Sequence, residues 1–485
     1  MISFSLSLIA LVLGYLLYGR FVERVFAPDN RATPALSKAD GMDYVVLPSW
    51  KIFMIQFLNI AGTGPIFGAI MGAKFGPVAY LWIVFGCIFA GAVHDYFSGM
   101  LSMRHAGAGL PELIGLYLGK ATKSLMLVFT VLLLIMVGTV FVYSPAEILH
   151  SISGDTMMWV AIIFVYYIIA TMMPIDKIIG KVYPLFAFSL LFMAGALMVW
   201  LFIHWPTVPE LWTNFYNMGA AAEPDTWKDN IFPALFITIA CGAISGFHGT
   251  QSPLMARCVK SERMGRPIFY GAMITEGIVA LIWATVASWF FYGNPAPGYE
   301  LIANATAGFH TSAPAVVNLV CNDWLGVAGA VLAMLGVVAA PITSGDTAFR
   351  SGRLIVAEWL KLDQRPIAKR LMICIPMFAC SIAMLVWQIE NPDGFNTIWQ
   401  YFGWSNQALS VFTLWTLTVY LVRNKKPFWI TLIPALFMTT VCSTFLFISK
   451  QAFYLPETVA YPLGGLCFLA AVVWFTIWYR KETKK

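Results

Sequence analysis

Charged side chains are scarce in this chain: Asp, Glu, Lys and Arg together make up 11% of its 485 residues. A soluble protein of this length needs far more charge on its surface, so the composition excludes an ordinary water-soluble fold. Apolar residues make up 59% of the chain, and its mean hydropathy is +0.75. These proportions predict an all-α protein that crosses the lipid bilayer many times.

Motifs of several other function classes are also missing. The sequence has no HExxH and no GxSxG segment, which argues against a membrane-embedded enzyme. Its eight cysteines form no CxxC pair, so no disulfide, metal site or cofactor is expected. The net charge of +6 comes from basic residues scattered over many connecting segments, so nucleic-acid binding is not predicted.

The chain does contain apolar runs near the roughly 20 residues that a helix needs to cross a bilayer. Thirteen are expected, at 3–19, 50–72, 77–99, 122–144, 157–173, 181–203, 231–256, 267–292, 324–346, 368–389, 398–422, 427–449 and 457–479. With the N-terminus outside, all but three of the 30 Lys and Arg residues fall on the inner side, the exceptions being Lys74, Lys228 and Lys450. The positive-inside rule therefore predicts a multi-pass inner-membrane (plasma-membrane) protein with its C-terminus in the cytoplasm.

Two of these runs contain glycine and proline clusters that predict a helix broken near the middle of the membrane. They are residues 59–65 (NIAGTGP) and 241–253 (CGAISGFHGTQSP). Glycine loosens a helix and proline is best tolerated at the start of a new one, so second half-helices are expected near Pro65 and Pro253. Unwound backbone survives at this depth only where protein or a wet cavity satisfies it, and a matched pair of breaks indicates a transporter's substrate site.

The broken helices are the second and the seventh of the thirteen, and the loop charges give them opposite orientations. Two five-helix units of this kind form an inverted repeat, which by analogy is the leucine-transporter-like fold with one extra helix before it and two after it. The alternative is that Gly-Pro pairs merely kink packed helices. The expected parts are 1–49 (N-terminal helix and cytoplasmic loop), 50–203 (first repeat), 204–230 (extracytoplasmic loop), 231–422 (second repeat) and 423–485 (two C-terminal helices).

Backbone N–H groups at the start of a half-helix carry partial positive charge and bind carboxylates. No cationic side chain is expected at this depth, so backbone dipoles are predicted to recognise a small carboxylate-bearing substrate. The predicted substrate-binding residues lie in the two breaks and are Asn59, Gly62, Thr63, Gly64, Ser245, His248, Thr250 and Gln251.

A strongly polar side chain inside a span costs roughly 2.5–3.5 kcal/mol to insert, so each one requires a reason. Glu276 has no cation nearby on its own helix, so its partner must come from another helix or the carboxyl stays protonated. His248 can change charge near neutral pH. Glu276, His94 and Asp95, together with His248, are the predicted proton-coupling residues, and a structural pairing of Asp95 with Arg104 or Arg257 is the alternative.

Two further groups have less specific signals. The adjacent hydroxyls of Thr343 and Ser344 can hold a sodium ion in the leucine-transporter-like fold, together with carbonyls of the first broken helix, so sodium is the alternative coupling ion. Asp346 and Arg350 have the spacing of a helical ion pair, and Arg353 lies one turn further on the same face. These three residues are predicted to form an inner gate, with a purely structural pair as the alternative.

Several motifs resemble the carbon starvation protein family of bacterial inner-membrane transporters, within the amino-acid/polyamine/cation superfamily. The motifs are 40–44 (DGMDY), 60–65 (IAGTGP), 90–95 (AGAVHD), 230–233 (NIFP), 236–248 (FITIACGAISGFH), 270–273 with Glu276, Asp346 with Arg350 and Arg353, and 402–407 (FGWSNQ). The resemblance implies uptake of pyruvate or peptides during nutrient limitation, driven by protons. Gln56 and Phe57 stand where a His-His pair often precedes the first break in longer members, which leaves substrate and coupling ion open.

The sequence therefore predicts a secondary active transporter for a small carboxylate-bearing nutrient, pyruvate or short peptides. A sodium-coupled amino-acid symporter of the same fold is the first alternative, and a nutrient sensor without transport is the second. The chain has no sizeable soluble signalling domain, which counts against the sensor. Its partners are a small-molecule substrate and the bilayer, and the sequence does not set the oligomeric state.

Overall fold

The computed structural model describes residues 1–150, 154–173, 179–216, 218, 230–293, 313–391 and 394–484. Within these ranges the chain forms helices and connecting segments, without a β-strand. Most of the expected loop 204–230, including Lys228, lies outside the described residues.

Helices occupy all of the apolar runs in the first half of the chain. Short π-helical and 3₁₀ turns, labelled η, interrupt several of them, as expected where glycine recurs. The elements are α1 (Ile2–Leu13), η1 (Gly14–Tyr18), α2 (Gly19–Phe26), α3 (Pro34–Ser37), α4 (Ser49–Ala61), η2 (Gly64–Gly68), α5 (Ala69–Gly72), η3 (Ala73–Phe75), α6 (Val78–Gly86), η4 (Cys87–Gly91), α7 (Ala92–Arg104), α8 (Leu110–Leu118), α9 (Lys120–His150), α10 (Thr156–Met172) and α11 (Ile179–His204).

The second half is built in the same way. Its elements are η5 (Ile231–Leu235), α13 (Phe236–Thr238), α14 (His248–Ala256), η6 (Glu262–Met264), η7 (Arg266–Tyr270), α15 (Gly271–Ser288), η8 (Trp289–Gly293), α17 (Ala313–Leu360), α18 (Ile367–Glu390), α19 (Gly394–Arg423), α20 (Trp429–Ile448) and α21 (Glu457–Glu482). α17 begins well before the expected residue 324, because a first segment joins it across a kink at Gly326, which has φ 62°.

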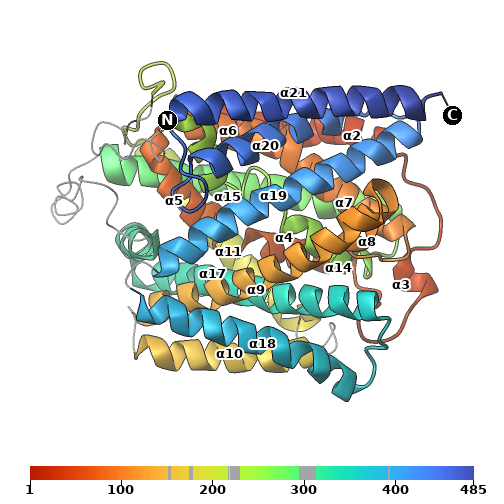
Figure 1. Ribbon diagram of the computed structural model, residues 1–485. Helices are drawn as coiled ribbons and strands as arrows, with labels where there is room; N and C mark the ends of the chain where they lie inside the picture. Colours follow the sequence, from red (N-terminus) through yellow and green to blue (C-terminus); the bar gives the residue numbers. More distant parts are fainter. Residues whose placement is uncertain are drawn as a thin grey trace.

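Nine helices in the described ranges are long and apolar enough to cross a membrane, and ten if the bent pair Ser49–Ala61 and Gly64–Phe75 forms one span. The prediction of an all-helical, multi-pass membrane protein is thus confirmed. The count of thirteen spans and the boundaries of the repeats stay predictions. The two termini lie at opposite ends of the helices (Figure 1).

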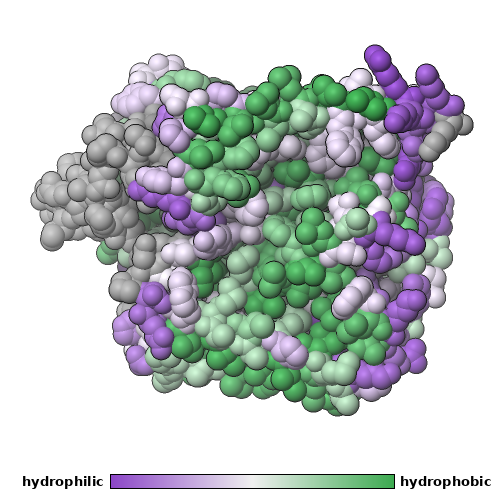
Figure 2. All heavy atoms as spheres, in the orientation of Figure 1, coloured by the Kyte–Doolittle hydropathy of each residue, from purple (hydrophilic) through white to green (hydrophobic). Residues whose placement is uncertain are grey.

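The broken helices lie at the centre of the bundle, where α4 and α14 pack against each other and against α17 (Figure 1). α9 packs along α17, while α20 and α21 pack outside α19. Hydrophobic residues cover the middle of the surface and hydrophilic ones gather toward its left and right ends (Figure 2). α21, for example, exposes a row of large apolar side chains, at Leu466, Leu469, Val473, Trp474 and Ile477. Lipid tails can cover such a face, whereas water cannot without a penalty.

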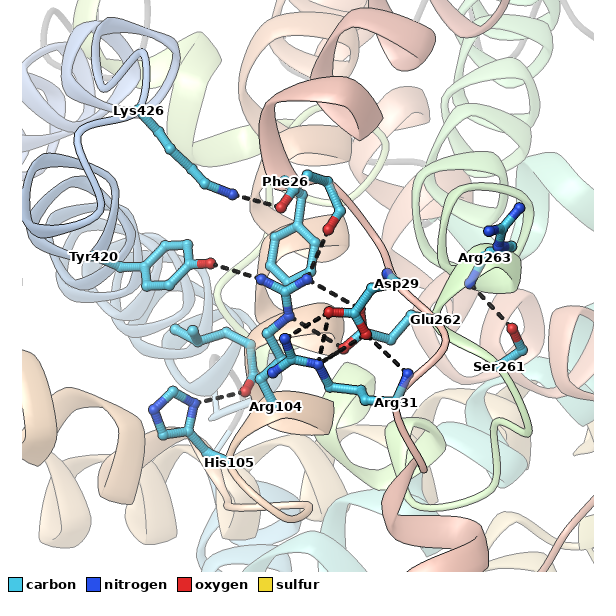
Figure 3. Close-up of polar contacts among 12 residues, drawn as sticks. Phe26, Asp29, Arg31, Arg104, His105, Ser261, Glu262, Arg263, Tyr420 and Lys426 are labelled. Carbon is cyan, nitrogen blue, oxygen red and sulfur yellow. Dashed lines mark hydrogen bonds and ion pairs between the residues drawn. The ribbon is translucent and has the colours of Figure 1, made fainter.

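An ion-pair cluster ties several helices together at one end of the bundle (Figure 3). The buried Glu262 carboxylate lies 3.0 Å from Arg104 at the end of α7 and 3.6 Å from Arg31. Arg104 also donates to the carbonyl of Ala27 at 2.8 Å, and Lys426 donates to that of Phe26 at 2.5 Å. The loops that follow α2, α14 and α19 therefore meet at this end.

Candidate functional site

The first predicted break is present. α4 ends at Ala61, and Gly62 adopts φ 18° and ψ −146°, which lies outside the helical range. η2 then begins at Gly64 with Pro65 in its first turn, and the two halves are bent by 49°. The second half-helix therefore starts where the Gly-Pro pair predicted it, because a proline at this position removes no helical hydrogen bond.

The second break is also present, but its end was predicted wrongly. α13 ends at Thr238, residues 239–247 are not helical, and α14 begins at His248. Pro253, the expected start, lies inside α14. Gly242 has φ 90°, a conformation that favours glycine and lies outside the helical range, so the chain is unwound at this position. The helix then resumes at His248, before the proline.

Asn406 of α19 satisfies much of the unwound backbone. Its side-chain oxygen accepts from the Phe247 amide at 2.7 Å and from the Ser245 hydroxyl at 3.1 Å. Its carbonyl accepts from the Gly246 amide at 3.1 Å. Sequence reasoning missed this role, although an Asn-Gln pair inside an apolar run was its signal.

Two more side chains hold the first half of the second broken helix. Trp82 of α6 donates its Nε1–H to the carbonyl of Ile239 at 2.7 Å. Gln407 donates to the carbonyl of Phe236 at 2.7 Å. Protein groups therefore supply the partners that unwound backbone requires at membrane depth.

The two breaks lie directly against each other. A Cβ atom added to Gly64 would collide with the side chain of Cys241, so the first break presses against the second where glycine leaves room. Near the breaks, the side-chain amide of Gln56 on α4 donates to the Ser252 hydroxyl on α14 at 3.1 Å. The central expectation from the sequence was that two interrupted helices meet inside the bundle, and they do.

The backbone amides that follow the second break are engaged within the protein. Each of the first three amides donates to the backbone carbonyl three residues earlier. The distances are 3.2 Å from His248 to Ser245, 3.0 Å from Gly249 to Gly246, and 2.9 Å from Thr250 to Phe247. The Thr250 hydroxyl also donates to the Phe247 carbonyl, at 2.7 Å. In this conformation these groups are therefore not free to receive a carboxylate.

Side chains beside the breaks do offer unpartnered polar atoms. Both side-chain polar atoms of Asn59, the hydroxyl of Thr63 and the side-chain oxygen of Gln251 have no hydrogen-bond partner among the described residues. All three side chains are fully buried. Because buried polar groups are nearly always paired, these atoms indicate a place where a polar ligand or water binds.

A chain of four ionisable groups crosses α7, α14 and α15. Asp95 lies between two histidines, with Nδ1 of His94 at 2.8 Å and Nδ1 of His248 at 3.0 Å. On the other side of the His248 ring, Nε2 lies 3.6 Å from the carboxylate of Glu276. All four side chains are fully buried. The partner that Glu276 required from another helix is therefore His248.

The alternative pairing of Asp95 with a nearby arginine is wrong. Arg104 pairs with Glu262, and Arg257 pairs with Glu358 at the end of α17. Asp95 is satisfied by the histidines instead, because its helix α7 packs along α14, which carries His248. The four side chains therefore contact one another in the order His94, Asp95, His248 and Glu276.

One group with metal-binding spacing occurs among the described residues, where sequence reasoning expected none. Ligating atoms of Cys241, His248 and Glu276 lie within 4.8 Å of one another. Sγ of Cys241 also lies 3.6 Å from the Ser245 hydroxyl. Metal binding would require the Cys241 thiolate, whereas the contacts of His248 with Asp95 and Glu276 form a histidine–carboxylate relay without a metal.

The hydroxyl pair on α17 divides between two roles. Ser344 donates to the carbonyls of Leu58 and Asn59, at 3.2 and 2.9 Å, and so contacts the end of α4 at the first break. Thr343 donates to Ala340 within its own helix at 2.9 Å. Only Ser344 of this pair therefore lies at the junction with the broken helix.

The predicted gate residues are buried, but Asp346 and Arg350 do not pair with each other in the described structure. Asp346 accepts from the Tyr183 hydroxyl at 2.5 Å. Arg350 and Arg353 instead lie 3.5 and 3.3 Å from Asp43, which precedes α4. Burial alone would raise the pKa of Asp43, but these guanidinium groups outweigh it and hold the pKa below its ordinary value.

An apolar groove in the surface lies away from these residues. It encloses about 490 Å³ between α6 and α20, and its lining is apolar and rich in aromatic rings, among them Trp82, Phe85, Phe89, Phe236 and Phe437. The predicted substrate and coupling side chains are buried instead. This conformation therefore holds the candidate site closed.

Two broken helices in contact at their breaks, inside a bundle of membrane helices, define a fold of the kind found in alternating-access transporters. Solved structures agree. The Eremococcus coleocola manganese transporter matches with a TM-score of 0.57 at 12% identity, over 92% of this chain and 100% of that chain. A Na⁺-coupled sialic acid symporter matches with a TM-score of 0.52 at 14% identity, over 96% of each chain.

Relatives in sequence narrow the class to one family. Residues 1–153, 142–324 and 295–445 match the profile described as Carbon starvation protein CstA, so the chain belongs to the carbon starvation protein CstA family. An uncharacterized membrane protein of Haemophilus influenzae is 45% identical over 61% of this chain and 92% of its own length. The peptide transporter CstA of Campylobacter jejuni is 28% identical over 88% of this chain and 77% of its own. The pyruvate/proton symporter BtsT of Escherichia coli is 25% identical, over 89% and 79%.

Proposed function

We propose that the chain is a secondary active transporter that takes up a small carboxylate-bearing nutrient across the inner membrane, coupled to protons, with its N-terminus outside and its C-terminus in the cytoplasm. The observation that carries this proposal is the position of His248. It opens the half-helix after the second break and contacts Asp95 on one side and Glu276 on the other.

Proton coupling needs an ionisable group whose surroundings change during the transport cycle. α14 belongs to a broken helix, and broken helices are the elements that rearrange around a midplane site. Movement of α14 separates His248 from either Asp95 on α7 or Glu276 on α15. Because a buried carboxylate without its cationic partner is strongly disfavoured, that movement would be linked to proton uptake or release.

The substrate side of the proposal rests on Asn59, Thr63 and Gln251. Their unpartnered polar atoms lie beside the first break and on α14, which leaves hydrogen-bonding capacity for a small polar solute. The names of the relatives, a peptide transporter and a pyruvate/proton symporter, point to solutes that share a carboxylate. We therefore propose pyruvate or short peptides, taken up during carbon starvation.

The test is uptake into proteoliposomes of labelled pyruvate and labelled dipeptides, under an imposed proton gradient or an imposed sodium gradient. A proton gradient should drive accumulation of one of these solutes. Glu276→Gln should abolish gradient-driven accumulation but retain exchange of internal for external solute, because exchange needs no net proton movement. Accumulation by Glu276→Gln that still follows the proton gradient would remove this residue from the coupling mechanism.

Sodium coupling is the second candidate, and Ser344 favours it. Its hydroxyl and the carbonyls of Leu58 and Asn59 converge at the first break, and hard oxygen donors of this kind suit a small cation. Uptake that requires sodium and is lost in Ser344→Ala, with Glu276→Gln unaffected, would replace the proton proposal with this one.

A further inference from the structure

Two buried arginines on α17 share a single carboxylate. Arg350 and Arg353 are fully buried, and both reach Asp43, at 3.5 and 3.3 Å. Each guanidinium group has five N–H donors, whereas one carboxylate has about four acceptor sites in all, so one carboxylate cannot satisfy two guanidinium groups. The pair therefore has more donors than Asp43 can accept.

The unused donors are visible in the structure. Nε of Arg350 and Nε of Arg353 have no hydrogen-bond acceptor among the described residues, and Nη1 of Arg350 has only its 3.5 Å ion-pair contact with Asp43. Nη2 of Arg353 donates to the Asp43 carboxylate at 3.3 Å. The other two hydrogen bonds go to neutral oxygens: Nη2 of Arg350 donates to the carbonyl of Ala170 at 2.6 Å, and Nη1 of Arg353 to the side-chain oxygen of Gln364 at 2.8 Å. Buried cations with free donors indicate a site that accepts an anion.

The neighbouring charged groups do not correct this imbalance. Glu358 is paired with Arg257, and Asp346 accepts from Tyr183. Arg370, a third buried cation nearby, donates to the carbonyl of Met172 at 2.5 Å and adds further positive charge. Asp346 also interacts electrostatically with Arg350, but the three guanidinium groups of Arg350, Arg353 and Arg370 outnumber the two carboxylates of Asp43 and Asp346, so the site has a net positive charge.

Asp43 comes from a segment built as a separate turn. The Asp40 carboxylate accepts from the amides of Met42, Asp43 and Tyr44, at 2.8, 3.0 and 2.9 Å, which holds the turn together from within. Tyr44 contacts the rest of the protein through its hydroxyl, 3.3 Å from the Ala106 carbonyl, and through its ring, 5.2 Å from the Arg257 guanidinium. The turn precedes α4, so an outward swing of α4 would carry Asp43 away from the arginines.

We propose that Arg350 and Arg353 form a carboxylate-binding subsite at the inner end of the transporter, which Asp43 occupies while this end is closed and the substrate carboxylate occupies when it opens. The substrate arm of this inference rests on the proposed function. Arg350 follows Ser344 by six residues on α17, roughly 9 Å along a helix, so the subsite lies one step beyond the central break. Return of Asp43 then displaces the substrate toward the cytoplasm.

The test is rescue of Asp43→Ala by small carboxylates. The full-length purified protein is unfolded by heat in formate, acetate, pyruvate or chloride at equal ionic strength. Asp43→Ala should unfold at a lower temperature than the wild type, and formate, acetate and pyruvate should each raise its midpoint in a saturable manner. The wild type should not respond, because Asp43 fills the site. The double variant Asp43→Ala/Arg353→Gln should lose the response.

Two controls make the outcome specific. Asp29→Ala removes an exposed carboxylate that is also paired with an arginine, Arg31, and should not be rescued. Asp43→Asn keeps the side-chain shape, so it serves if Asp43→Ala does not fold. A formate response that Arg353→Gln leaves unchanged, or no response in either Asp43 variant, would overturn the subsite.

The pyruvate arm separates this inference from the proposed function. Rescue by formate and acetate but not by pyruvate would overturn the exchange with substrate. Rescue by all three, in a protein that takes up neither pyruvate nor dipeptides, would support the subsite and count against the proposed function. Uptake of pyruvate or dipeptides without rescue by any carboxylate would support the proposed function and count against the subsite.

Discussion

The contact between the two breaks gives a direct test of the structure through Gly64→Ala. The added Cβ would collide with Cβ and Sγ of Cys241; Sγ can rotate away, but Cβ is fixed to the backbone and cannot. Overpacking of this kind costs about 1–3 kcal/mol. The variant should therefore unfold at a lower temperature and lose uptake, because the two breaks can no longer approach.

Gly195→Ala is the matched control, since a Cβ there meets nothing within 4 Å. It lies within α11, where alanine is favoured over glycine by about 1 kcal/mol, so its stability should be unchanged or slightly increased. The second arm is Cys241→Gly in the Gly64→Ala background, which removes the opposing atoms and should recover most of the loss. Thermal unfolding followed by tryptophan fluorescence measures all four proteins. Equal stability of Gly64→Ala and Gly195→Ala, or no recovery with Cys241→Gly, would refute the proposed contact.

Three further predictions concern other parts of the molecule. Asn406→Ala leaves the Phe247 amide without its acceptor, and the unfolding free energy should fall by about 1–3 kcal/mol, as measured by denaturant titration. The pKa of Asp43 is held below its ordinary value, so its ion pair with Arg353 stabilises the protein above about pH 4 and is lost as the pH falls further; the stability difference between wild type and Asp43→Asn should shrink over that range in unfolding measured at stepped pH. Chelation of divalent metals should leave uptake unchanged, and stoichiometric metal found in purified protein by mass spectrometry but absent from Cys241→Ser would contradict the relay assignment.

Backbone breaks could be predicted from sequence where glycine and proline act locally. Gly64 and Pro65 start their half-helix as their own preferences dictate. The second break was displaced from Pro253 because the partner of its unwound backbone is Asn406, which lies 159 residues from Phe247. No local pattern reports a partner at that separation.

Side-chain pairing shows the same limit. Asp346 and Arg350 have the right spacing for a helical ion pair, worth only a few tenths of a kcal/mol. Burial makes other partners far more valuable, and Tyr183 and Asp43 take these positions from segments remote in sequence. Asp43 lay in a motif quoted for the family resemblance, yet nothing local assigned it a role. Glu276 was different, because a carboxyl on an apolar helix with no nearby cation predicts a partner from another helix.

The cluster around Glu262 has a consequence for how the chain may be shortened or fused. Lys426, just before the last two helices, bonds to the end of α2, near the beginning of the chain, and Phe21 stacks on Trp429 with ring centroids 5.7 Å apart. The N-terminal helices α1 and α2 and the C-terminal helices α20 and α21 lie outside the two expected repeats, yet these contacts join the two groups. Deleting either group would remove contacts that hold the other, so a tag or fusion partner should follow α21 rather than replace it.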